Sequence, residues 1–191
     1  MDGLRQARRG ARALAVQALY QVELAGVSPT QGVRTAARLG APEETIGAEG
    51  QSAPQADLAY AEEIVAYAWG HRGEVDTIIS GTSTHWKLSR LGRTEVQVLR
   101  VATAEMLRFP DVPPAVVMDE AVDLARAFAG DEAARFVNGV VDAIGPLGRG
   151  LAPGAPRACG TIAQSAVRAQ APQAVQGRGR CRGRRVHSES P

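Results

Sequence analysis

The chain has 191 residues, of which 45% are hydrophobic and only 4% aromatic, a composition that favours a single domain of closely packed helices over a sheet protein. No run approaches the roughly 18 apolar residues of a membrane span, and the first 158 residues contain no cysteine, so we expect no membrane segment, no disulfide framework and a cytoplasmic location. The charge is uneven: residues 1–145 contain 14 Lys and Arg against 19 Asp and Glu, whereas residues 146–191 contain 8 Arg against 1 Glu.

The first predicted helix, over residues 4–24, carries a cluster of arginines ahead of an apolar stripe. At helical spacing the arginines share one face; they are Arg5, Arg8, Arg9 and Arg12. Asp2 is the only acid among the first 12 residues, so we expect the first two turns to project from the core and to present guanidinium groups to phosphates and unpaired bases. A solvated helix end is the simpler alternative. A transit peptide is a further one, although the stretch contains no Ser and runs into a regular apolar stripe.

Apolar residues recur at helical spacing beyond this first helix. Further helices are expected over residues 31–39, 57–69, 75–82, 94–109, 113–128 and 131–144. Residues 40–56 lack a period and are expected to form a connection, and residues 85–92 are expected to be irregular. Because no segment shows strand-like alternation, the sequence predicts an all-α bundle over about residues 3–145.

Residues 146–191 are rich in Gly, Pro, Ala, Gln, Arg and Ser and contain no apolar stripe. We therefore expect a disordered tail outside the folded domain. Its Gly-Arg run resembles segments that bind nucleic acid loosely, and an unconstrained extension of the chain is the alternative.

The sequence offers no pattern typical of a catalytic or metal site. The adjacent carboxylates at 62–63 and 119–120 would point to different faces of their helices, and His71 and His85 have no partner at metal-ligand spacing. The glycines form no phosphate-binding loop after a strand. We therefore expect recognition rather than catalysis, with no cofactor and no metal.

Several motifs resemble the NusB transcription antitermination family. They are AVQALY at 15–20 after the Arg-rich start, WKLSRL at 86–91 followed by Glu95 and LRVA at 99–102, DVP at 111–113, DEAVDLARAF at 119–128 and FVNGVV at 136–141. The resemblance covers about residues 5–145 and implies about seven helices in two packed three-helix groups. It also implies binding of single-stranded boxA RNA in ribosomal RNA leaders, together with NusE, a ribosomal protein that joins the transcribing RNA polymerase. It leaves a homodimer open.

The resemblance further implies where RNA and partner bind. The family's RNA contacts centre on the start of the first helix, so the RNA-binding set here is Arg5, Arg8, Arg9 and Arg12, with Tyr20 as an additional candidate. By analogy, the surface shared by RNA and partner comprises Glu95 and the turn formed by Gly130, Asp131 and Glu132.

Three positions depart from the family pattern. Gly10 interrupts the run of basic residues, Val96 replaces a basic residue, and Ala104 replaces an aromatic residue. The competing interpretation is a helical protein–protein interaction module, such as a homodimer or a ribosome-assembly factor, that binds RNA only incidentally.

Overall fold

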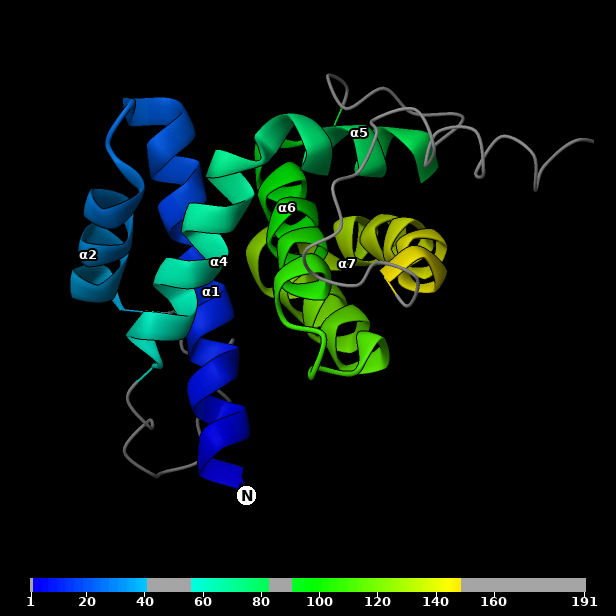
Figure 1. Cartoon of the computed structure of the whole chain (residues 1–191), viewed down its shortest axis with the longest axis horizontal. Coiled ribbons are helices and arrows are strands. Elements are labelled where there is room, and N and C mark those ends of the chain that lie inside the picture. Colours follow the sequence, from blue (N-terminus) through cyan, green and yellow to red (C-terminus); the bar gives the residue numbers. More distant parts are fainter. Residues whose placement is uncertain (1, 41–55, 83–90, 149–191) are drawn as a thin grey trace, which may run out of the picture.

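The computed structural model describes residues 2–40, 56–82 and 91–148, and all regular structure in these ranges is helical. The helices are α1 (Asp2–Ala25), α2 (Pro29–Leu39), α4 (Leu58–Gly70), α5 (Arg72–Thr82), α6 (Arg93–Arg108) and α7 (Pro114–Gly148) (Figure 1). Gly130 has non-helical backbone angles and divides α7 into two helical segments, so the predicted bundle of about seven helices is confirmed. Within the described ranges no helix is long and apolar enough to cross a membrane. The expectations for residues 41–55, 85–90 and 149–191 lie outside those ranges.

Local capping chemistry sets several helix ends close to the predicted ones. At the start of α2 the hydroxyl of Ser28 accepts a hydrogen bond from the backbone N–H of Gln31, and at the start of α4 the carboxylate of Asp57 accepts one from that of Tyr60. Gly26 follows α1 with a φ of 66°, a conformation that glycine adopts without steric cost.

Two helix ends differ from the predictions for structural reasons. Helix α5 begins at Arg72 rather than near residue 75, so only His71 separates it from α4. Helix α7 continues past Gly145, where we expected it to stop. Gly145 is buried, and a Cβ at this position would lie 2.9 Å from the sulfur of Met118. This glycine therefore serves close packing between the two segments of α7 instead of ending the helix.

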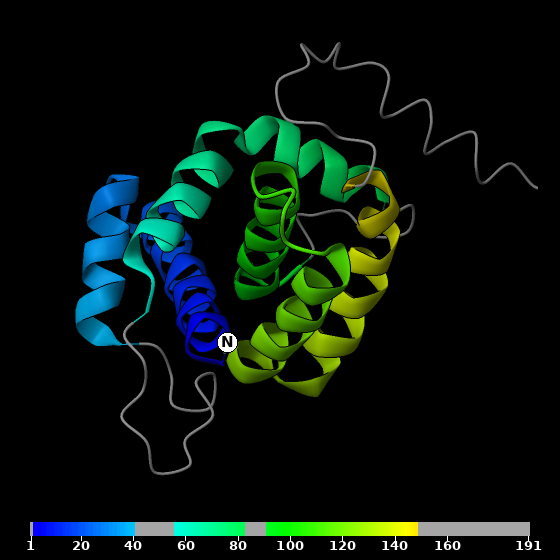
Figure 2. The same ribbon diagram turned by 60° about the horizontal axis from the view of Figure 1, so that its bottom comes forward.

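The helices form two packed groups, as predicted, each of three helices when the two segments of α7 are counted as one. Helices α1, α2 and α4 pack against one another, α5, α6 and α7 form the second group, and α6 joins the groups by contacting both α1 and α4 (Figure 2). The close approach of α1 and α2 depends on Gly32, because a Cβ there would lie 2.9 Å from the carbonyl oxygen of Ala18. The core is built mainly from Ala, Val, Leu and Ile side chains of all six helices.

A buried ion cluster also joins the two groups. Arg100 of α6 is only 3% exposed and donates two hydrogen bonds to Asp76 of α5, at 2.8 and 3.0 Å, and one to Glu23 of α1 at 3.0 Å. Burial alone would lower the pKa of Arg100, but the bonds to Asp76 and Glu23 raise it. Arg100 therefore keeps its charge, and its bonds tie α1 to α5 and α6.

Candidate nucleic-acid interface

The four arginines at the start of α1 do not share one environment. Arg5 is exposed, Arg8 and Arg9 are half-buried, and Arg12 is only 3% exposed. The prediction that all four project from the core without counter-charges is therefore wrong for Arg12 and, in part, for Arg9. The reason lies in carboxylates from α6 and α7 that are distant in sequence.

Arg12 is enclosed in a buried polar cluster between α1, α4 and α6. Its Nε donates to both carboxylate oxygens of Glu105, and its Nη2 lies 2.6 Å from Glu105 Oε1. The hydroxyl of Tyr60 donates to the same carboxylate. Because these bonds use the guanidinium fork of Arg12 inside the protein, this side chain cannot reach RNA without disrupting the core.

The environment of the cluster keeps its arginine charged and its tyrosine neutral. Burial would lower the pKa of Arg12, but the hydrogen bond and the charge of Glu105 raise it. Burial and the neighbouring carboxylate of Glu105 together raise the pKa of Tyr60 well above its ordinary value. The cluster is therefore a fixed ion pair with a neutral hydroxyl donor, and its role is to hold α1 on α4 and α6.

Arg9 makes a weaker and more accessible ion pair. Its Nη2 donates to Asp123 Oδ2 of α7 at 2.8 Å, and the side chains of Arg9 and Asp123 are 32% and 41% exposed. The Nε of Arg9 lies 3.8 Å from Glu120 Oε2. Partly exposed, one-point ion pairs of this kind contribute about 0–1 kcal/mol, so Arg9 can exchange its partner at low cost.

Arg5 and Arg8 have no carboxylate partner among the residues that the structure describes. The guanidinium carbon of Arg8 lies 4.9 Å from the ring centroid of Tyr60, close enough for a cation–π contact that orients the side chain without neutralising its charge. The accessible basic surface of α1 therefore consists of Arg5 and Arg8. Arg9 joins this surface when its ion pair with Asp123 opens.

Gly10 occupies its position for a packing reason. It is buried, and a Cβ there would lie 3.2 Å from the Cβ of Ala56. The adjacent Asp57 N–H donates to the carbonyl oxygen of Ala7 at 3.2 Å. A basic side chain at position 10 would therefore displace the segment that enters α4 rather than extend the basic face.

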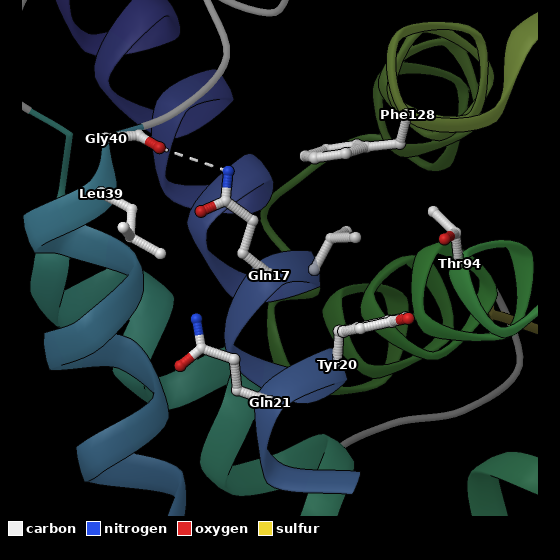
Figure 3. Close-up of a pocket in the computed structure, with 8 residues that line it drawn as sticks. Gln17, Tyr20, Gln21, Leu39, Gly40, Thr94 and Phe128 are labelled. Atoms are coloured by element: carbon white, nitrogen blue, oxygen red, sulfur yellow. Dashed lines mark hydrogen bonds between the residues drawn. The ribbon is translucent and has the colours of Figure 1, made fainter. Parts of the chain in front are cut away.

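Tyr20 lies farther along α1 and is 37% exposed. It lines a groove of about 360 Å³ formed by α1, the end of α2, the start of α6 and α7, with Val16, Gln17, Gln21, Leu39, Gly40, Thr94 and Phe128 (Figure 3). Gln17 donates to the carbonyl oxygen of Gly40 across one wall of this groove. The groove brings Tyr20 close to the start of α6 and to the end of the first segment of α7.

The predicted partner residues border these same elements. Glu95 follows Thr94 in the first turn of α6, and its carboxylate accepts a hydrogen bond from the backbone N–H of Gly92, which caps the helix. Gly130, at a φ of 85°, produces the break in α7, and Asp131 and Glu132 are exposed beside it. Tyr20 thus lines the groove itself, whereas Glu95 and the turn around Gly130 follow its lining residues Thr94 and Phe128 in sequence.

The family model for NusB matches residues 9–145. The chain belongs to the NusB family. Its relatives include the transcription antitermination protein NusB of Sorangium cellulosum, 40% identical over 145 residues that cover 75% of this chain and 95% of that protein. The protein of the same name from Nitratidesulfovibrio vulgaris strain Miyazaki F is 36% identical over 149 residues, 75% of this chain and 90% of that protein.

A solved structure of the antitermination factors NusB and NusE in complex with double-stranded RNA is also similar. The match is 30% identical, has a TM-score of 0.58 and covers 74% of this chain and 97% of that chain. The sequence-based assignment to the NusB family and to its helical fold is confirmed.

On this NusB fold, the acidic partners of the basic face come from distant helices and were not predicted from the sequence. Glu105, Glu120 and Asp123 contact Arg9 or Arg12 across more than 90 positions of sequence. A usable signal was present for Glu105, which follows Ala102 by three positions on the inward face predicted for α6. A carboxylate on a buried stripe requires a cation or several hydrogen bonds. Arg126 was also overlooked, although it bonds both Asp123 and Asp131.

Proposed function

We propose that the protein is a transcription antitermination factor that binds single-stranded boxA RNA of ribosomal RNA leaders together with NusE. The observation that carries this proposal is the accessible basic end of α1, where Arg5 and Arg8 lack carboxylate partners in the described part of the chain, on a fold similar to a NusB chain solved with NusE and RNA. The names of the relatives support the antitermination role.

The expected chemistry is recognition of an unpaired strand. Guanidinium groups of Arg5, Arg8 and Arg9 form charge-assisted bonds with phosphates, while exposed bases stack on guanidinium planes or on the ring of Tyr20. Arg12 is removed from the contact set because it is buried against Glu105. It acts instead by holding the helix that carries the other three.

Two or three phosphate contacts give only modest affinity, which explains why a protein partner is needed. NusE bound to the same RNA raises the effective concentration of the second interaction. We assign the partner surface to Glu95 and the turn of Gly130, Asp131 and Glu132, which follow the groove residues Thr94 and Phe128 in sequence. The complex would act on the transcribing RNA polymerase in the cytoplasm. The activity is assigned to residues 3–145, without catalysis or a cofactor, and residues 146–191 are proposed to be a tail outside this unit.

Binding of a boxA-type leader RNA, measured by fluorescence anisotropy with and without NusE across a salt series, tests this function. We expect binding that weakens with salt, with a slope in log K against log salt of roughly −0.7 for each phosphate contact, and that tightens when NusE is added. A scrambled single strand and a duplex of the boxA sequence serve as controls, and both should compete poorly. Equal binding of all three RNAs, or no effect of NusE, would favour the protein-interaction module with incidental RNA binding.

A further inference from the structure

We propose that Arg9 of α1 and Arg126 of α7 form one phosphate-binding site for the RNA backbone, and that the carboxylate of Asp123 occupies this site when RNA is absent. This inference rests on the RNA-binding function proposed above. It assigns an RNA contact to Arg126 in the first segment of α7, a residue that neither the sequence motifs nor the position of the basic helix indicated.

The geometry is that of two guanidinium groups on one small anion. Arg9 Nη2 lies 2.8 Å from Asp123 Oδ2, and Arg126 Nη1 lies 2.9 Å from Asp123 Oδ1. Each arginine therefore holds a different oxygen of the same carboxylate. A phosphodiester also presents two anionic oxygens, and arginine forks match both kinds of anion, so a phosphate can take the place of the carboxylate between the same two side chains.

The burial of the carboxylates around this site decides which of them can leave. The side chain of Glu105 is fully buried against Arg12, and that of Glu120 is 6% exposed. Asp123 is 41% exposed and Arg126 is 53% exposed. Asp123 can therefore turn into water while its neighbours stay fixed, and it is the side chains of Arg9 and Asp123 that bridge α1 and α7 here.

The formal charges around the site determine when a phosphate can replace the carboxylate of Asp123. Four anions outnumber the three cations of this cluster: Glu105, Glu120, Asp123 and Asp131 against Arg9, Arg12 and Arg126. A phosphate that approaches this cluster meets an excess of negative charge, but withdrawal of Asp123 removes that excess and leaves the guanidinium groups of Arg9 and Arg126 facing the phosphate. Asp123 thus lowers RNA affinity and suppresses binding of unrelated polyanions until contacts elsewhere on the strand offset its displacement.

The test uses the full chain with the boxA-type RNA and compares four variants. Asp123→Asn should tighten binding about fivefold at low salt, as expected from removing a competing surface ion pair, and should steepen the salt slope by roughly 0.7. Asp119→Asn removes the same charge from an exposed position on the same helix and should change affinity less than twofold. Arg126→Gln should weaken binding about fivefold, and in the double variant with Asp123→Asn the tightening should be largely lost.

The outcomes separate this inference from the function on which it rests. If wild-type protein binds the RNA but Asp123→Asn behaves like Asp119→Asn, or Arg126→Gln binds as wild type, the shared phosphate site is wrong and the RNA-binding function stands. If wild-type protein does not bind the RNA, both are wrong. Thermal melts of each variant control for folding, and the exposed Arg126 supplies a readout even if Asp123→Asn proves unstable.

Discussion

Replacing Glu105 with Gln is expected to lower the free energy of unfolding by about 3–5 kcal/mol, because it leaves a buried cation without its counter-charge. Arg12 cannot escape by losing its proton, because a guanidinium group stays protonated in proteins. The hydroxyl of Tyr60 also loses its charged acceptor. Urea titration monitored by circular dichroism measures the loss.

A double variant distinguishes an ion-pair effect from simple loss of packing. Arg12→Met combined with Glu105→Leu removes both charges and keeps apolar volume, so it should recover most of the stability that Glu105→Gln loses. A double variant as unstable as the single one would show that the cluster stabilises the fold by shape rather than by charge pairing.

Replacing Arg100 with Leu is expected to cost about 2–3 kcal/mol of unfolding free energy, because three hydrogen bonds that join α1, α5 and α6 disappear. The cost should be smaller than for Glu105→Gln, since the side chains of Asp76 and Glu23 are 28% and 30% exposed and can be hydrated.

The matched control is Arg108→Leu on the same helix. Arg108 pairs with Glu63 at 3.1 Å, but both side chains are 50% exposed, so the expected change is below about 1 kcal/mol. Similar losses for Arg100→Leu and Arg108→Leu in parallel thermal melts would contradict the idea that the buried cluster joins the two helix groups.

The helices were predictable because their signals are local. Ser28, Asp57 and Gly26 lie within a few residues of the ends that they stabilise, and the apolar periods follow directly from the side chains that enter the core. The end of α7 was not predictable in this way, because the fit of Gly145 against Met118 joins two helix segments. Helical period and capping describe one helix at a time and carry no information on such contacts.

Only the arginines of the candidate site were predictable from the sequence. The spacing of Arg5, Arg8, Arg9 and Arg12 placed them on one face of α1, which is correct as helix geometry. The pattern could not show that this face turns from solvent into the core within two turns, nor that α6 and α7 supply its counter-charges. Pairing across distant helices depends on tertiary packing. Only the structure therefore shows that Arg12 is buried and paired, whereas Arg5 and Arg8 are accessible.

The RNA affinity of the Arg5→Ala, Arg8→Ala double variant tests the central claim most directly. Loss of two charge-assisted contacts should weaken binding to the boxA-type RNA by about 2 kcal/mol and flatten the salt slope by roughly 1.4, with little change in melting temperature. Arg34→Ala with Arg38→Ala removes equal charge from exposed positions of α2 and should leave the affinity nearly unchanged. If both double variants bind RNA as tightly as the wild type, the accessible end of α1 is not the RNA-binding surface.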